Sequence, residues 1–136
     1  MMLLKEYKNG KKFGCSADIA YYKEIQYLRN EDRENFIVLG LSNKNKVLFK
    51  ELVHIGIANQ CLVGIPEIFR QLITKGAVRF IAIHNHPSGE VTPSAEDSAL
   101  TRKLVDVGNL VGIKLLDHII LGEEDYFSFA DVGMIS

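Results

Sequence analysis

The sequence predicts an α/β fold, a three-layer αβα sandwich in which helices cover both faces of a mixed sheet. Apolar runs of strand length alternate along the chain with segments that show the helical spacing of apolar residues. Strands that alternate with helices in this way place helices on both faces of the sheet. The 136 residues, 47% of them hydrophobic, are enough for a single domain that buries its own core.

The chain is expected to begin with an N-terminal segment and a helix, residues 1–30, that pack on the domain formed by residues 31–136. Ser16 is a residue type that caps helices, and the helix is expected to run from it to about Arg29. The residues expected on its buried side are Ile19, Tyr22, Ile25 and Tyr27.

The middle of the chain predicts a β-hairpin followed by a helix. Residues 36–41 and 46–55 have strand character and are separated by the turn signal Ser-Asn-Lys-Asn at 42–45. Pro66 stands at the favoured first position of a helix that Gly76 ends. The core stripe of this helix is expected to consist of Ile68, Phe69, Leu72 and Ile73.

The C-terminal half is expected to alternate between strand and helix. A central strand at residues 78–83 precedes a loop, and Ser94 then begins a helix. Residues 113–121 are expected to form another buried strand, and residues 126–129 a short edge strand. The residues that the helix turns inward are expected to be Leu100, Leu104 and Val107.

Two histidines and an aspartate predict a metal site behind the central strand. His84 and His86 follow the apolar run directly, and Asp97 comes after ten intervening residues. Because alternate strand residues point to the same side, both imidazoles can reach one ion while Asn85 faces the other way. Zinc binds nitrogen and oxygen ligands, and three protein ligands leave a fourth position for water. The sequence therefore predicts an open Zn²⁺ site, although manganese or cobalt also suits two histidines and an aspartate.

Ser94 and Asp97 also have the spacing of a helix capping box. In such a box the serine caps the helix and the residue three positions later binds back to the cap. This spacing places Asp97 in the first helical turn, close to the two histidines. By itself the pair favours a purely structural cap, and the neighbouring histidines are what favour a metal site.

These residues resemble the JAMM motif of MPN+ metallopeptidases, with His-x-His-Pro from His84 to Pro87, then Ser94 with seven residues between it and His86, and then Asp97. The segments 84–89, 93–94, 115–122 and 126–129, together with Asp97 and Thr101, are similar to the RadC-type JAB domain in particular. The resemblance extends from about residue 35 to residue 135. It implies a cytidine-deaminase-like JAB/MPN fold and a zinc-dependent metallopeptidase-like hydrolase of peptide or isopeptide bonds.

The resemblance also implies catalytic roles for two further side chains. JAMM enzymes use a glutamate at the edge of the first strand as general base, and Glu34 stands at the matching position. Glu51 on the second strand is the competing candidate. Ser94 is expected to donate a hydrogen bond to the oxyanion that forms when water attacks a carbonyl, in competition with capping.

Asp117 and His118 are neighbours on a predicted buried strand, so their side chains are expected on opposite faces. His118 is interpreted as a core histidine with satisfied hydrogen bonds, or alternatively as a partner that hydrogen-bonds a metal ligand. Asp117 is expected to hold neighbouring backbone in place.

The alternative function is a non-catalytic, zinc-stabilised interaction domain associated with DNA-repair or mobile-element proteins. Glu34 distinguishes the two interpretations, because a site without a nearby carboxylate lacks a base. A zinc nucleoside deaminase is disfavoured, since that chemistry uses H-x-E with P-C-x-x-C and this chain has neither.

The resemblance implies a peptide or protein substrate, and charge and hydropathy argue against nucleic acid and membrane as partners of this domain. The net charge is −1 and the basic residues do not cluster, so we expect no direct DNA binding by this domain alone. Residues 1–4 are too short for a signal peptide and no apolar segment is long enough to span a membrane, so a cytoplasmic protein is expected. An exposed sheet edge at residues 36–41 or 126–129 is expected to pair with a substrate strand or with a second copy in a homodimer.

Overall fold

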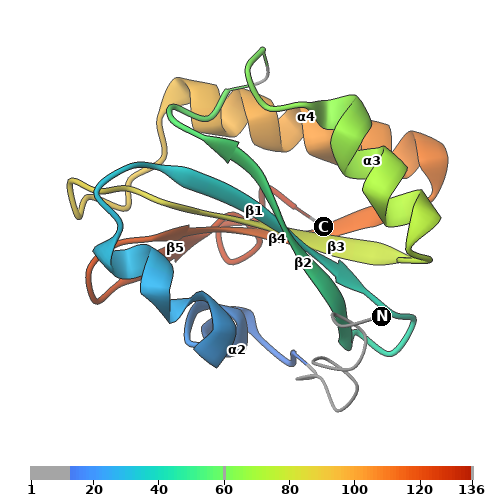
Figure 1. The fold of residues 1–136 in the computed structure, drawn as a ribbon, viewed down its shortest axis with the longest axis horizontal. Coiled ribbons are helices and arrows are strands. Elements are labelled where there is room, and N and C mark those ends of the chain that lie inside the picture. Colours follow the sequence, from blue (N-terminus) through green and yellow to red (C-terminus); the bar gives the residue numbers. More distant parts are fainter. Residues whose placement is uncertain (1–12, 60, 136) are drawn as a thin grey trace.

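The computed structural model describes residues 13–59 and 61–135, and the strands in these residues form one five-stranded sheet (Figure 1). Residues 1–12 of the predicted N-terminal segment, with the apolar stretch at 1–4, lie outside the described part. In chain order the strands are β1 (Asn35–Leu41), β2 (Val47–Ile55), β3 (Arg79–Asn85), β4 (Lys114–Leu121) and β5 (Tyr126–Ser128).

Helices lie on both faces of this sheet, which confirms the predicted three-layer αβα arrangement (Figure 1). Helices α3 (Ile65–Thr74) and α4 (Ala95–Val111) cover one face. The short helix α2 (Ser16–Ala20) and the 3-10 helix η1 (Lys23–Asn30) pack against the other. Within the described residues, no helix combines the length and the apolar character needed to cross a bilayer.

The sheet is mixed and has the order β2-β1-β3-β4-β5. β1 pairs antiparallel with both β2 and β3, β3 pairs parallel with β4, and β4 pairs antiparallel with β5. The predicted hairpin is thus confirmed. The expectation that residues 36–41 form an exposed edge is wrong, because β3 returns beside β1 and encloses it. In the described residues the edges are β2 and β5, as expected for residues 126–129.

The predicted helix from Ser16 to Arg29 is wrong as a single helix. Its α-helical part ends at Ala20, and the backbone of Tyr22 (φ −58°, ψ 128°) interrupts it before the 3-10 helix begins. Nε2 of Gln26 donates to the carbonyls of Ala20 and Tyr22 at 2.8 and 2.7 Å. These bonds satisfy carbonyl groups that a continuous helix would have paired internally, so the break has its own stabilising contact.

The buried sides of the helices agree with the sequence at most positions. Ile19, Tyr22 and Ile25 are buried as expected, but Tyr27 is 46% exposed and lies beneath Nζ of Lys50, 4.7 Å from its ring centroid. Of the four core residues predicted for α3, Ile68, Phe69 and Leu72 are buried. The fourth, Ile73, is 61% exposed because it lies one position past the buried side of the helix.

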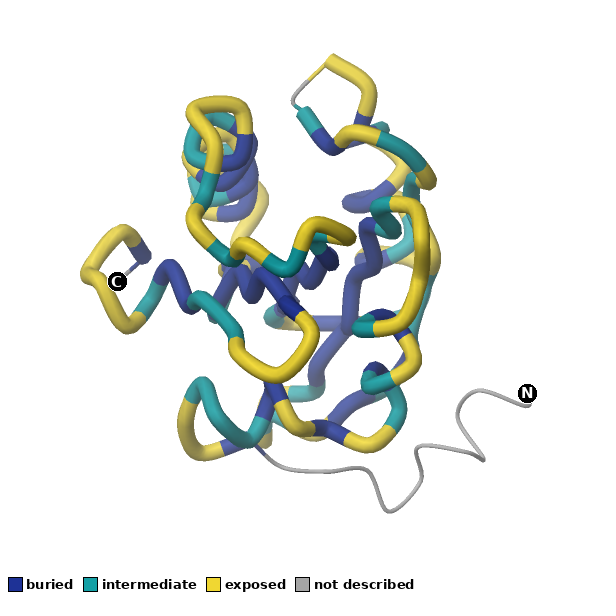
Figure 2. Tube along the Cα trace, turned by 90° about the vertical axis from the view of Figure 1, so that its left-hand side faces the viewer, coloured by how far each residue is buried: buried dark blue, intermediate teal, exposed yellow. Residues whose placement is uncertain are grey.

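The sheet separates two hydrophobic cores in the described part of the chain. Phe36 and Val38 of β1 face α3 and α4, whereas Ile37 and Leu39 face α2 and η1. This double burial explains why the strand sequence is apolar without a break. In Figure 2 the buried residues lie in the middle of the molecule and the exposed residues lie mainly in the loops.

The two adjacent positions in α3 give a test of this packing. Leu72→Ala is expected to lower the free energy of unfolding by ~2–5 kcal/mol, because it leaves a cavity beneath the helix. Ile73→Ala, the matched control, is expected to change it by less than ~0.5 kcal/mol because its side chain is exposed. Urea denaturation followed by circular dichroism measures both, and equal losses would contradict the described orientation of α3.

Candidate metal centre

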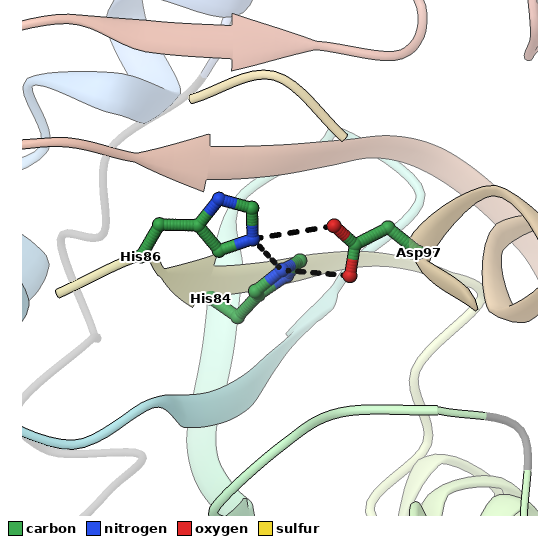
Figure 3. Close-up of side chains that lie close together, drawn as sticks. All are labelled: His84, His86 and Asp97. Carbon is green, nitrogen blue, oxygen red and sulfur yellow. Dashed lines mark hydrogen bonds and ion pairs between the residues drawn. The ribbon is translucent and has the colours of Figure 1, made fainter. Parts of the chain in front are cut away.

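The side chains of His84, His86 and Asp97 converge at one end of β3 (Figure 3). Nε2 of His84 lies 3.1 Å from Nε2 of His86 and 3.2 Å from Oδ1 of Asp97. Nε2 of His86 lies 3.2 Å from Oδ2 of Asp97. His84 and Asp97 are buried, whereas His86 is partly exposed. The three predicted ligands are thus brought together within coordination distance of a shared point.

Strand alternation places the two histidines as predicted. His84 lies in β3, and His86 follows the strand, anchored by its backbone N–H to the carbonyl of Leu121 at 3.0 Å. Asn85, between them, points away from the site. Its Oδ1 accepts from the backbone N–H of Asn35 at 2.7 Å, and its Nδ2 donates to the carbonyl of Arg33 at 2.9 Å. Asn85 therefore fixes the end of β3 against the start of β1.

The capping box brings Asp97 to the same point. Oγ of Ser94 accepts from the backbone N–H of Asp97 at 3.0 Å, and Oδ2 of Asp97 accepts from the backbone N–H of Ser94 at 2.8 Å. The spacing thus forms the predicted cap, and the cap holds the Asp97 carboxylate toward the histidines. The structural and the functional interpretations of this pair are compatible.

The two histidine Nε2 atoms and the Asp97 oxygens that face one another are suited to bind a cation. Nδ1 of His86 lies 2.7 Å from the carbonyl oxygen of Glu90, which only accepts, so this nitrogen carries the ring hydrogen. Nε2 of neutral His86 then presents a lone pair toward the Asp97 carboxylate, which also only accepts. Two such acceptors at 3.2 Å repel each other unless a proton or a metal ion lies between them. Imidazole nitrogens and a carboxylate oxygen are the donor set of a zinc site with an open position.

Electrostatics also favour a cation at this point. Burial raises the pKa of Asp97, but the imidazole groups of His84 and His86 beside its two oxygens outweigh this effect and hold that pKa well below its usual range. The hydrogen bond to Asp97 raises the pKa of His86 against the opposing effect of burial. Asp97 therefore stays negative throughout the neutral range and attracts positive charge to the two histidines.

Glu34 lies at the rim of this cluster. Its Oε1 is 3.9 Å from Nε2 of His86, and its Oε2 accepts from the backbone N–H of Ala58 at 3.2 Å. The backbone N–H of Gly56 donates to the Glu34 carbonyl at 2.8 Å and ties it to the end of β2. Glu51 lies elsewhere, with its Oε1 3.6 Å from Nζ of Lys75. Of the two candidate bases, Glu34 is the one beside the histidines.

His118 touches the centre directly, so both interpretations of it hold. It is completely buried, and its Nε2 lies 2.8 Å from Nδ1 of His84. Burial lowers the pKa of His118 well below its usual range, and repulsion from His84 adds to the effect. Thr101, which lies 2.6 Å from Nδ1 of His118, received no role from the sequence. Its place four residues after Asp97, on the same side of the helix, was the available signal.

Asp117 holds neighbouring backbone, as expected. Its Oδ1 accepts from the backbone N–H groups of His118 and Ala130 at 2.7 and 3.0 Å, and its Oδ2 accepts from Oγ of Ser128 at 2.6 Å. Burial raises the pKa of Asp117, and these hydrogen bonds oppose the rise. Asp117 thus ties β4 to the segment after β5.

Comparison with known proteins gives a consistent result. The family model for the RadC-like JAB domain matches residues 14–134. A UPF0758 protein from Desulforamulus reducens is 44% identical over 111 residues, which are 82% of this chain and 49% of that protein. A UPF0758 protein from Bacillus cereus is 38% identical over 136 residues, 98% of this chain and 59% of the relative. The UPF0758 protein YsxA from Bacillus subtilis is 43% identical over 111 residues, 82% and 48% respectively. The chain thus spans about half to three fifths of these relatives.

Replacement of the carboxylate ligand is expected to weaken metal binding without unfolding the chain. Asp97→Asn keeps an oxygen for the cap but loses the negative charge. Losing a residue that only orients a metal ligand raises the Kd ~10–100-fold, and losing the charge of a ligand itself is expected to raise the Kd for zinc by more than that. Competition with a chromophoric chelator measures the Kd. Asp106→Asn, on the exposed side of the same helix, is the matched control and should bind zinc as the wild type does.

The zinc affinity is also expected to fall as the pH falls. Since the pKa of His86 is raised, protons compete for its Nε2 from a pH above the ordinary imidazole value of about 6.5. Below the His86 pKa the affinity should drop ~tenfold per pH unit for each proton that the metal displaces. Chelator competition across the neutral range measures this, and an affinity that stays constant down to ordinary imidazole pKa values would contradict it.

Proposed function

The chain belongs to the family of RadC-like JAB domains, and on that premise we propose that it is a zinc-dependent hydrolase of peptide or isopeptide bonds. The observation that carries the proposal is the position of a free carboxylate oxygen of Glu34 beside the His84, His86 and Asp97 cluster. A carboxylate oxygen beside the ligands supports hydrolysis over a site that only stabilises the fold, because only hydrolysis needs a base. The hydrolase needs both parts, and they lie together.

His84, His86 and Asp97 would hold the ion and leave a coordination position for water or substrate. When bound, zinc supplies Lewis acidity that makes water a nucleophile near neutral pH and polarises a carbonyl oxygen. The nearly complete burial of His84 and Asp97 keeps the ligand atoms shielded from bulk water. The partly exposed His86 leaves one side of the cluster open to a substrate.

Glu34 is the proposed general base. The hydrogen bond from Ala58 occupies its Oε2 and leaves Oε1, the oxygen nearer His86, free to accept a proton from the attacking water. Glu34 lies directly before β1, and both its backbone and its carboxylate are anchored: its carbonyl accepts from Gly56 and its Oε2 from Ala58, both just after β2. This support suits a base that must keep a constant distance to the reacting atoms.

Ser94 is the proposed donor to the oxyanion. Its Oγ accepts the backbone N–H of Asp97, which uses a lone pair and leaves the hydroxyl hydrogen available. Capping and oxyanion stabilisation can therefore use different parts of the same hydroxyl. The hydrogen is proposed to bind the oxygen on which negative charge develops as water adds to the carbonyl.

A surface groove reaches the partly exposed side of the cluster and is the proposed route for a peptide substrate. It has a volume of about 280 Å³ and extends from His86 to Glu123. Its walls are residues 29–32, which precede β1, and the turn at residues 86–89. Since this chain spans only part of its relatives, the substrates of the longer proteins are proposed here only at the level of peptide and isopeptide bonds.

A conservative change at Glu34 separates hydrolysis from metal binding. Glu34→Gln is expected to lower kcat ~10²–10⁴-fold, the usual contribution of a general base, while zinc remains bound. Glu51→Gln is the matched control, because Glu51 pairs with Lys75 away from the cluster, and it should cleave as the wild type does. Cleavage of a pooled peptide library and of isopeptide-linked peptides by the zinc-loaded protein, with zinc content by elemental analysis, gives both quantities.

Two outcomes would contradict the proposal. If Glu34→Gln cleaves at the wild-type rate, Glu34 is not the base. If the zinc-loaded wild type cleaves neither peptides nor isopeptides, the non-catalytic interaction domain becomes the better interpretation.

A further inference from the structure

A chain of hydrogen bonds runs from helix α4 to the candidate ligand His84. Oγ1 of Thr101 donates to the backbone carbonyl of Asp97 at 2.8 Å and lies 2.6 Å from Nδ1 of His118. The other ring nitrogen of His118, Nε2, lies 2.8 Å from Nδ1 of His84. All four residues are almost completely buried. The chain therefore joins two candidate metal ligands through groups that are shielded from solvent.

Aromatic neighbours hold the His118 ring in one orientation. Phe129 stacks on it with ring centroids 4.8 Å apart and an interplanar angle of 20°. Phe36 meets it edge-on at 5.6 Å and also stacks on His84 at 5.8 Å. In an interior packed this closely, the two ring nitrogens of His118 cannot exchange places unless these neighbours move. Nδ1 therefore stays on Thr101 and Nε2 stays on His84.

The donors and acceptors along this chain set the tautomer of His84. A backbone carbonyl only accepts, so the hydroxyl hydrogen of Thr101 points to Asp97 and Oγ1 is left to accept from Nδ1 of His118. His118 then carries its hydrogen on Nδ1, and its Nε2 accepts from Nδ1 of His84. With its hydrogen on Nδ1, His84 presents the lone pair of Nε2 toward His86 and Asp97.

We propose that Thr101 and His118 are positioning residues that fix the tautomer of His84 and aim its Nε2 lone pair at a bound divalent cation. The proposal rests on the metal site within the proposed function and is independent of whether the site hydrolyses a bond. Helix α4 would thus act on the centre twice. Its first turn carries the ligand Asp97, and its second turn, through Thr101 and His118, orients a ligand on β3.

The first test measures metal affinity in variants of the full chain, with Zn²⁺ and Co²⁺ alone as probes. Thr101→Val and His118→Phe preserve size approximately, and each is expected to raise the Kd ~10–100-fold, the usual cost of losing a residue that orients a ligand. Thr101→Ser keeps the hydroxyl and should bind metal within about threefold of the wild type. Because Thr101 acts through His118, the double variant should bind no more weakly than His118→Phe alone.

A matched control separates this role from general loss of packing. Ser128→Ala removes another buried hydroxyl, the one that donates to Asp117, without touching His118. It is expected to lower the melting temperature of the metal-free protein and to leave the Kd unchanged. Equal increases in Kd for Ser128→Ala and Thr101→Val would overturn the proposal, because the effect would then be structural. So would an unchanged Kd in Thr101→Val and His118→Phe.

The second test reads the tautomers in the wild type and does not depend on any variant folding well. Nitrogen-15 NMR of the histidine-labelled, zinc-loaded protein is expected to show His118 with its hydrogen on Nδ1 and an unprotonated Nε2. His84 is expected to carry its hydrogen on Nδ1. A hydrogen on Nε2 of His118 would overturn the proposal. Absence of peptide cleavage would refute only the hydrolase, because neither measurement involves a substrate.

Discussion

The parallel pairing of β3 with β4 is the constraint on which the rest of the structure depends. Parallel neighbours need a crossover connection, which α4 supplies by running back over one face of the sheet. A crossover helix begins near the end of the strand before it, so the first turn of α4 meets the carboxyl end of β3. Asp97 therefore lies beside His84 and His86, and β4 brings His118 alongside. Ligands of α/β proteins commonly bind at such strand ends.

Asp97 ties the stability of α4 to the chemistry of the site. A buried carboxylate is costly unless hydrogen bonds and opposite charge surround it. Here its oxygens receive the backbone N–H of Ser94 and face both histidines at the positive end of the helix. Since the cap and the candidate ligand are the same carboxylate, the sequence has little freedom at this position. A residue that only completed the capping box at N3 could be a neutral amide such as glutamine, whereas one that also offers charge to a metal must be a carboxylate.

Short-range patterns predicted most of this arrangement. The strand and helix segments, the capping box and the convergence of His84, His86 and Asp97 all follow from residues that lie close together along the chain, with ten residues between His86 and Asp97. The features that spacing missed depend on contacts between distant segments. Nothing in residues 36–41 says that β3 will return on their open side, and the break at Tyr22 depends on how Gln26 and the sheet meet the helix. The contact of Thr101 with His118 likewise requires the packing of α4 on β4.

The unequal burial of the two histidines determines from which side a metal ion would reach or leave the site. His84 is fully enclosed, whereas the side chain of His86 is 12% exposed and is held by the Glu90 carbonyl in the loop after β3. An ion that entered from solvent would therefore meet His86 before it reached His84. Release would follow the reverse order, so the contact between His86 and the Glu90 carbonyl would help to retain a bound ion.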